Sequence, residues 1–188
     1  PEFVVNPEPV PKYKDMTVDD RRALQKQRRL QRQALKEWWM ERMVTTQAPL
    51  QEQMLLFWHN HFTTSGQKVA DPILLHGQHE LLRNQSLGRF DLMLRLVVQD
   101  PAMLNYLDNS KNKKGKPNEN LARELLELYT LGEGNYTEKD IKETARALTG
   151  WSTDNLSRSF RLKAKQHDNG RKTILGESGG FTMPQVLD

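Results

Sequence analysis

Apolar residues recur every three or four positions along most of the chain, which is the spacing of amphipathic helices. A long first helix is predicted to follow Thr17 and Asp20, which have the spacing of a capping box. Prolines that can occupy a first helical turn, and the capping residues Asn118 and Thr137, mark further helix starts. Later helices are therefore expected at about 49–62, 72–83, 87–99, 101–107, 118–132 and 137–150.

The pattern changes at Trp151, after which two short stretches, 159–164 and 172–175, are predicted to be strands. Asp168, Asn169 and Gly170 would supply the turn between them. Residues 1–14 hold four prolines and little periodicity, which predicts an extended arm. We expect a mainly α fold: an irregular multi-helix bundle over 15–150, with a small β-hairpin and the start of a truncated C-terminal region over 151–188.

The 188 residues, 36% hydrophobic and 28% charged, suit one well-buried domain. There is no cysteine, so a disulfide framework, a thiolate metal site and a cysteine nucleophile are excluded. The longest apolar run is far too short to cross a bilayer. The net charge of +4 is uneven, because residues 12–42 hold ten Lys and Arg against five Asp and Glu. We favour a solvated surface for these charges, and nucleic acid is not the expected partner.

The segment FWHNHF places two histidines beside Asn60 at the end of the second predicted helix. His61 shares the apolar arc of that helix, whereas His59 lies about 160° away on a regular helical wheel. A turn at Phe62 could bring both imidazoles together as ligands for zinc, copper, nickel or iron. We favour buried histidines with ordinary hydrogen bonds and keep the metal as the alternative.

The next polar motif is NENLARELLELYTLG, which starts at Asn118. One face of this helix is apolar, and the other carries polar side chains one turn apart. Those polar side chains are Asn120, Arg123, Glu124 and Glu127, with Glu119 also able to pair with Arg123. We favour a solvated face, and the alternative is a mixed site in which Glu119 or Glu124 meets His59 or His61.

Two further histidine groups have weaker patterns. His76 and Glu80 are one helical turn apart, with His79 between them, and we favour a polar helix surface there. His167 precedes Asp168 at the proposed hairpin turn, where the aspartate would serve turn geometry and the histidine has no assigned role.

The order of FWHNHF, DPAMLNYLDN, the motif from Pro117 to Trp151, and HDNGRKTILG resembles the bacterial family called domain of unknown function 1800. The resemblance covers residues 24–188 and implies a larger, mainly helical and often exported protein, with sequence missing at both ends. It carries the motif residues over as candidates for a site or a polar core. These residues are His59, Asn60, His61, Asn118, Glu119, Asn120, Arg123, Glu124, Glu127, His167, Asp168 and Gly170.

Three functions remain open from the sequence. We favour an envelope-associated or secreted protein that binds an envelope ligand or protein partner through a polar helical cleft. Its binding residues would be Asn60, Asn118, Asn120, Arg123, Glu127 and His167. The enzyme alternative is metal-assisted hydrolysis, in which His59, His61 and Glu124 hold a divalent transition metal and Glu119 is the general base. The third alternative is a structural helical domain.

Overall fold

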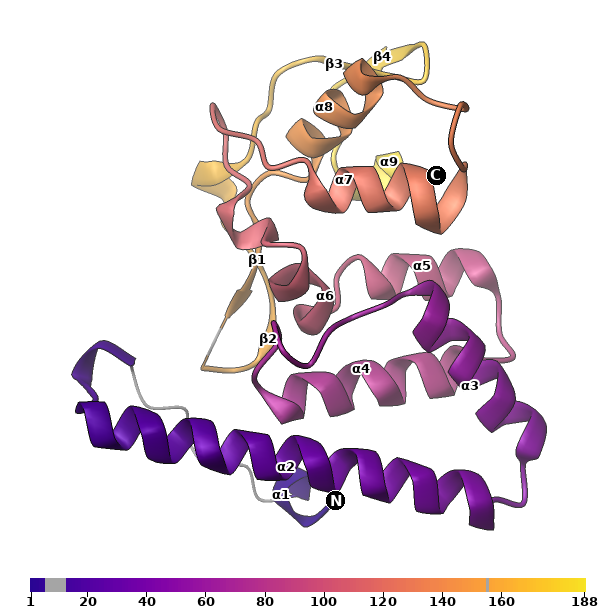
Figure 1. The fold of residues 1–188 in the computed structure, drawn as a ribbon. Helices are drawn as coiled ribbons and strands as arrows, with labels where there is room; N and C mark the ends of the chain where they lie inside the picture. Colours follow the sequence, from indigo (N-terminus) through magenta and orange to yellow (C-terminus); the bar gives the residue numbers. More distant parts are fainter. Residues whose placement is uncertain (6–12, 155) are drawn as a thin grey trace.

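The computed structural model describes residues 1–5, 13–154 and 156–188, and this part of the chain is mainly helical (Figure 1). The longer helices are α2 (Val18–Thr45), α3 (Pro49–His61), α4 (Pro72–Gln85), α5 (Phe90–Val97), α7 (Asn120–Glu124) with its continuation η3 (Leu125–Thr130), and α8 (Glu138–Ala147). Short helical segments are α1 (Glu2–Val5), η1 (Tyr13–Asp15), α6 (Pro101–Tyr106), η2 (Asn109–Lys111), η4 (Ala164–Gln166) and α9 (Met183–Val186). The predicted fold class is confirmed.

The elements stack in successive layers (Figure 1). Helix α2 lies along one side, α4 packs between α2 and the helices α5 and α6, and α7 and α8 lie at the opposite end. The C-terminal α9 packs against α8, and Arg95 of α5 donates to the backbone carbonyl of Leu187 at 3.0 Å. Nothing among the described helices is long and apolar enough to span a membrane.

Local sequence signals explain where several helices begin. Thr17 and Asp20 form a reciprocal capping box at the start of α2, and Thr137 and Asp140 form another at α8, as predicted. Proline occupies the first turn of α3, α4 and α6, where its missing N–H costs no helical hydrogen bond. The buried Asp100 caps α6 by accepting from the backbone N–H of Met103.

Two predicted helices differ in detail from the observed ones. Helix α5 begins at Phe90 rather than near Leu87, because a turn in which the Gly88 N–H donates to the Gln85 carbonyl ends α4 first. The helix that follows Asn118 changes into a π-helix over Leu125–Thr130, and its periodicity alone does not predict this widening.

The predicted pairing of the strands is wrong. Strand β2 (Ser159–Leu162) pairs with β1 (Trp151–Asp154), and β3 (Lys172–Ile174) pairs with β4 (Glu177–Gly179), both antiparallel. The Asp154 carboxylate accepts from two backbone N–H groups and turns the chain back within the first hairpin. Leu175 and Gly176 both have positive φ, which lets a two-residue turn close the second hairpin. Asp168 does accept from the Gly170 N–H as a local turn, but this turn joins η4 to β3.

The first fourteen residues are not extended throughout, because Glu2–Val5 form one helical turn and Tyr13–Asp15 a 3-10 turn. The expected arm between them, with prolines at positions 7, 9 and 11, lies outside the described residues.

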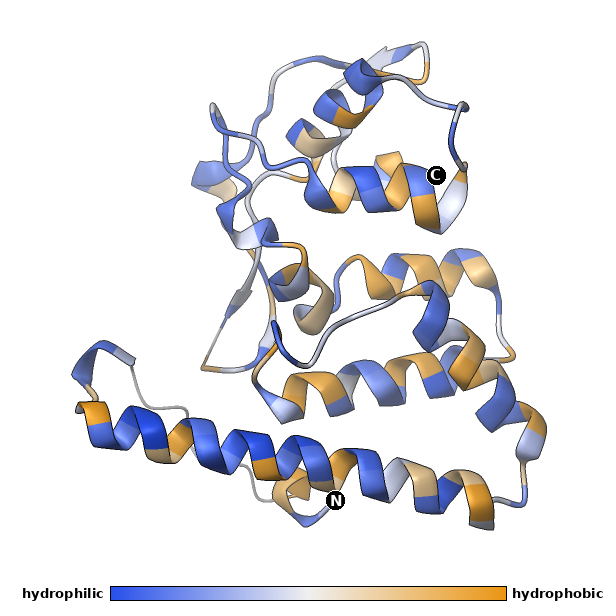
Figure 2. Cartoon of the chain, in the orientation of Figure 1, coloured by the Kyte–Doolittle hydropathy of each residue, from blue (hydrophilic) through white to orange (hydrophobic). Residues whose placement is uncertain are grey.

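The main hydrophobic core lies among α3, α4, α5, α6, α7 and α8. Its fully buried members include Leu55, Phe62, Met93, Leu121 and Ile141. Helix α2 contributes no buried residue, and Figure 2 shows it as largely hydrophilic along its length. Something other than extensive apolar burial must therefore hold α2 in place.

Gly150 is the glycine that the fold requires most clearly. Its φ is +83°, and a Cβ atom there would lie 2.8 Å from the Lys163 carbonyl oxygen and 3.1 Å from the His167 nitrogen. Both neighbours are backbone atoms, which cannot rotate away as a flexible side chain could. The close approach joins the end of α8 to the segment that follows β2.

We expect Gly150→Ala to lower the free energy of unfolding by about 1–3 kcal/mol, because it forces a strained backbone and a backbone clash. The matched control is Gly77→Ala in α4, where an added Cβ meets nothing within 4 Å and alanine has the better helix propensity. Urea titrations of both variants measure the difference. Equal stability of the two variants would contradict this account of Gly150.

Candidate functional site

Helix α2 is tied to α3 and α4 by arginine and carboxylate groups. The Glu52 carboxylate is 3% exposed, and its Oε1 accepts from Arg83 Nε at 2.9 Å and lies 3.7 Å from Arg42 Nε. Arg42 also donates to Glu80 at 3.4 Å, while its guanidinium lies over the Trp38 ring. These contacts join one cation of α2 to carboxylates on two other helices.

Farther along the same interface, two tryptophans of α2 pack against imidazoles. The Trp39 ring centre lies 4.7 Å from that of His59 and 5.0 Å from that of His79. Trp38 contacts His76 and His79, each at 5.3 Å. The structure thus brings together histidines from two motifs that the sequence keeps separate, FWHNHF and the His76–Glu80 segment.

Both central imidazoles are neutral at pH 7. Burial lowers the pKa of His59 to about 4, because the imidazolium would lose its hydration. Burial lowers the pKa of His79 to about 3, with smaller contributions from neighbouring histidines and from Arg42 and Arg83. His59 Nε2 and His79 Nδ1 lie 3.3 Å apart, so one imidazole donates to the other.

This pair forms part of the wall of a cavity of about 490 Å³ between α2, α4 and the segment after α3. Apolar area comes from Leu35, Trp39 and Leu75. The polar lining consists of Arg29, Arg32, Gln33, Lys36, His59, Thr64, Ser65, Gln67, Gln78 and His79, with Gly66 beside them. The described lining holds three cationic side chains and no carboxylate.

The three cationic side chains of the cavity differ in whether they have a hydrogen-bond partner within the described part of the protein. Arg32 is fixed, because its Nη1 donates to the backbone carbonyl of Ala70 at 2.8 Å. Arg29 and Lys36 are exposed, and neither has a hydrogen bond or ion pair with any described residue. Two charges at the cavity are therefore available to a ligand.

His61 faces the other side of α3, as the helical wheel predicts. Its ring lies 6.0 Å from that of Tyr129, and the neighbouring Phe62 lies 5.1 Å from the same tyrosine. The FWHNHF helix therefore packs near the π-helical end of the Asn118 helix. The Nε2 atom of His61 is buried and has no hydrogen-bond partner in the described structure.

The alternative interpretation of these two motifs is a mixed site in which Glu119 or Glu124 meets His59 or His61. No hydrogen bond or ion pair between described residues joins His59 or His61 to Glu119 or Glu124. Over the described ranges, no group of three or more His, Asp or Glu side chains could hold a metal ion. The metal set of His59, His61 and Glu124 and the divalent transition metal remain a prediction from the sequence.

The polar face of α7 forms ion pairs that are mainly at the surface. Arg123 makes two hydrogen bonds of 2.9 Å to Glu138 and lies 3.6 Å from Glu119. The half-buried Glu127 accepts from the Tyr136 hydroxyl at 2.6 Å and raises the pKa of that phenol to about 12. Partial burial raises the pKa of Glu124, with a smaller contribution from Glu127.

The three asparagines predicted to bind have different surroundings. Asn60 and Asn120 are exposed, whereas Asn118 is half-buried. The Asn118 Oδ1 accepts from the Asn120 N–H, which starts α7, and the Asn118 N–H donates to the buried Asn112. Asn118 thus has a local structural role in the start of the helix.

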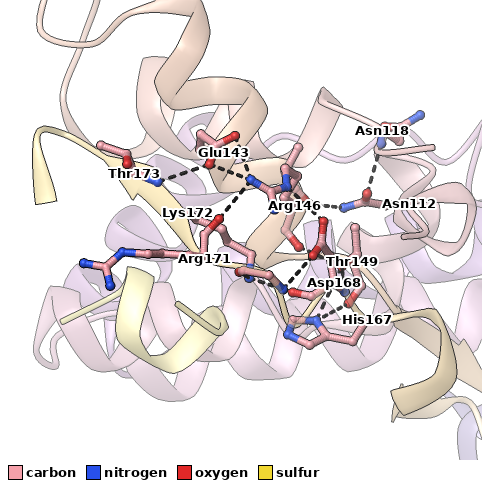
Figure 3. A network of polar contacts seen from close by, with 12 residues as sticks. Asn112, Asn118, Glu143, Arg146, Thr149, His167, Asp168, Arg171, Lys172 and Thr173 are labelled. Carbon is pink, nitrogen blue, oxygen red and sulfur yellow. Dashed lines mark hydrogen bonds and ion pairs between the residues drawn. The ribbon is translucent and has the colours of Figure 1, made fainter. Parts of the chain in front are cut away.

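His167 belongs to a separate polar network near the C-terminal end (Figure 3). Its Nδ1 donates to the Thr149 carbonyl at 2.9 Å, and the Thr149 hydroxyl accepts from the Asp168 N–H. Arg146 of α8 donates to Asp168 and to Glu143, and this pairing lowers the pKa of Asp168. The HDNGRK motif therefore fastens the segment before β3 to α8.

Lys172 completes this network from within β3. Its side chain is almost fully buried, and its Nζ donates to the backbone carbonyls of Asp168 and Gly170 at 2.6 and 3.0 Å. Burial lowers the pKa of this amine. Because both acceptors are backbone atoms, the lysine has a structural role: it stabilises the turn before β3.

Sequence reasoning missed much of the cavity. The polar-surface interpretation of the His76–Glu80 segment is wrong for His79, which is 3% exposed. Trp39 and Gln78 belong to none of the motifs that the sequence singles out. The useful signal was the combination of a basic helix containing Trp38 and Trp39 with a histidine-rich helix downstream.

The neutral imidazoles predict acid sensitivity. Because the folded pKa values of His59 and His79 lie below the unfolded value of about 6.5, the unfolded chain binds more protons below that pH. Their contribution to stability is complete above pH 6.5 and falls as the pH drops towards 4. Asp100 acts in the opposite direction, since burial raises its pKa to about 7.

We expect His79→Gln to flatten the dependence of the free energy of unfolding on pH between 6.5 and 4. Urea titrations of wild type and variant at several pH values give this slope. The readout is the slope, so a uniform loss of packing in the variant does not affect it. Parallel profiles would contradict the neutral, buried state of His79.

Comparison with known proteins agrees with the motif order. A family model described as Protein of unknown function (DUF1800) matches residues 6–188. No curated protein and no solved structure gives a significant match. The family match spans nearly the whole chain, and the chain belongs to the DUF1800 family.

Proposed function

We propose that the chain is a ligand-binding domain whose cavity beneath α2 takes a small organic anion. The observation that carries this proposal is the charge of the lining: Arg29, Arg32 and Lys36 with no described carboxylate. Cations that surround a concave site raise the local concentration of anions and pair with them directly.

The size and composition of the cavity support a small molecule. Its volume of about 490 Å³ lies within the usual range for ligand pockets, roughly 300–1,000 Å³. Such pockets combine apolar walls with a few polar groups that fix orientation. Leu35, Leu75 and Trp39 would contact the body of the ligand, and Arg29 and Lys36 its acid group.

The neutral state of His59 and His79 also supports an anion-binding cavity. If His59 and His79 were charged, they would repel the cations of α2 and destabilise the interface. Held neutral, they supply polar contacts while the positive charge stays on the exposed Arg29 and Lys36. The proposal keeps the binding function predicted from the sequence but assigns it to a different set of residues, in the cavity beneath α2.

No reaction is assigned, since the residues expected for metal-assisted hydrolysis lie in separate contacts. An envelope or secreted location, expected from the family resemblance, is compatible with a ligand of this kind and forms part of the proposal. A signal sequence or fractionation of cells would test the location independently of the cavity.

The double variant Arg29→Gln with Lys36→Gln should weaken anion binding by roughly tenfold or more, because it removes charge-assisted contacts. Calorimetry with gluconate, hexanoate and inorganic phosphate measures the loss, and binding to wild type should weaken as ionic strength rises.

The matched control is Arg22→Gln with Lys26→Gln, which removes the same charge from α2 outside the cavity lining. This control should bind like wild type. Equal losses in both double variants would mean that the net charge of α2, rather than the cavity, attracts the anions. Failure of all three anions to bind wild type would overturn the proposal.

A further inference from the structure

The carboxylate of Glu80 favours one hydrogen-bonding polarity of the histidine pair. His79 Nε2 is buried without a hydrogen-bond partner and lies 3.9 Å from the Glu80 carboxylate oxygen. That distance is too long for a hydrogen bond, but the negative charge still favours a proton on this nitrogen. A neutral His79 with its proton on Nε2 has an acceptor at Nδ1.

The tautomer of His79 determines the tautomer of His59. Since His79 Nδ1 accepts, the His59 Nε2 that lies 3.3 Å away must be the donor. A neutral His59 protonated at Nε2 has a lone pair at Nδ1. This atom has no hydrogen-bond partner among the described residues, and it is not fully buried. The cavity wall therefore presents an acceptor at His59.

Gln78 supplies a second acceptor to the same wall. Its amide nitrogen donates to the buried Asp100 carboxylate at 2.9 Å, which fixes the orientation of the amide. The carbonyl oxygen has no hydrogen-bond donor among the described residues, and it too is not fully buried. Buried acceptors are costly when a ligand covers them without donating a hydrogen bond.

We infer that the ligand is a hydroxy acid, an organic anion whose hydroxyl groups donate to His59 and Gln78. This inference rests on the proposed anion-binding function and names its ligand class. A hydroxyl group fits better than an ammonium group, because the described lining offers cations and neutral acceptors but no carboxylate to pair with an amine.

The test compares three six-carbon probes on the wild-type chain by calorimetry. Gluconate carries charge and hydroxyls, hexanoate carries charge alone, and sorbitol carries hydroxyls alone. We expect gluconate to bind on the order of tenfold more tightly than hexanoate, the value of about one good hydrogen bond, and sorbitol to bind weakest.

The outcomes separate the two proposals. Hexanoate binding as tightly as gluconate would overturn the hydroxy-acid inference and leave anion binding intact. Sorbitol binding as tightly as gluconate would overturn the anion-binding function itself, and with it the inference that rests on it.

A pair of variants locates the effect. His59→Phe keeps an aromatic ring at this position but removes the nitrogen that accepts. The preference for gluconate over hexanoate should therefore disappear. His61→Phe makes the same change two residues along α3, outside the cavity lining, and should keep the preference. An unchanged preference in His59→Phe would overturn the assignment of the acceptor.

A direct measurement on wild type does not depend on any variant folding. Long-range proton–nitrogen NMR of histidine-labelled protein at pH 7.5 reports which ring nitrogen carries the proton. An unprotonated Nδ1 on His59 supports the inference. A protonated Nδ1 would overturn it.

Discussion

The attachment of α2 to α3 and α4 through Glu52 is the contact on which the candidate site depends. Helix α2 buries no side chain fully, so the hydrophobic effect alone does not fix its position. Glu52 is a nearly buried carboxylate that faces guanidinium groups from α2 and α4. Removing either arginine would leave a poorly compensated buried charge, which is strongly destabilising.

Such a contact specifies geometry more than it adds stability. A buried ion pair recovers its desolvation cost only when the partners hold a defined arrangement. Arg42 of α2 meets Glu52 on α3 and Glu80 on α4, so few positions of α2 satisfy both contacts. The register that satisfies them also places Trp39 against His59 and His79 and leaves the cavity on the adjacent stretch of α2.

The sequence predicted what depends on neighbouring residues. The capping boxes at Thr17 and Thr137 and the prolines at helix starts are local signals, and the corresponding helices form. The strand pairing failed because Leu175 adopts a positive φ that its side chain disfavours, while Asn169–Gly170 looked like the better hairpin turn. The burial of His79 depends on a helix more than thirty residues earlier, which no local pattern contains.

The histidine motifs of the chain divide into two physical roles. His167 donates from Nδ1 to a backbone carbonyl and lies in a network with Arg146, Asp168 and Lys172 that joins α8 to the segment before β3. His59 Nε2 lies 3.3 Å from the Nδ1 of another imidazole, and in the inferred tautomer His59 keeps an unused acceptor at a cavity. A histidine whose hydrogen bonds end on the backbone fixes the fold, whereas one with an unused acceptor at a cationic pocket has bonding capacity left for a ligand. That difference, rather than the motif letters, makes α2 and α3 the place to look for function.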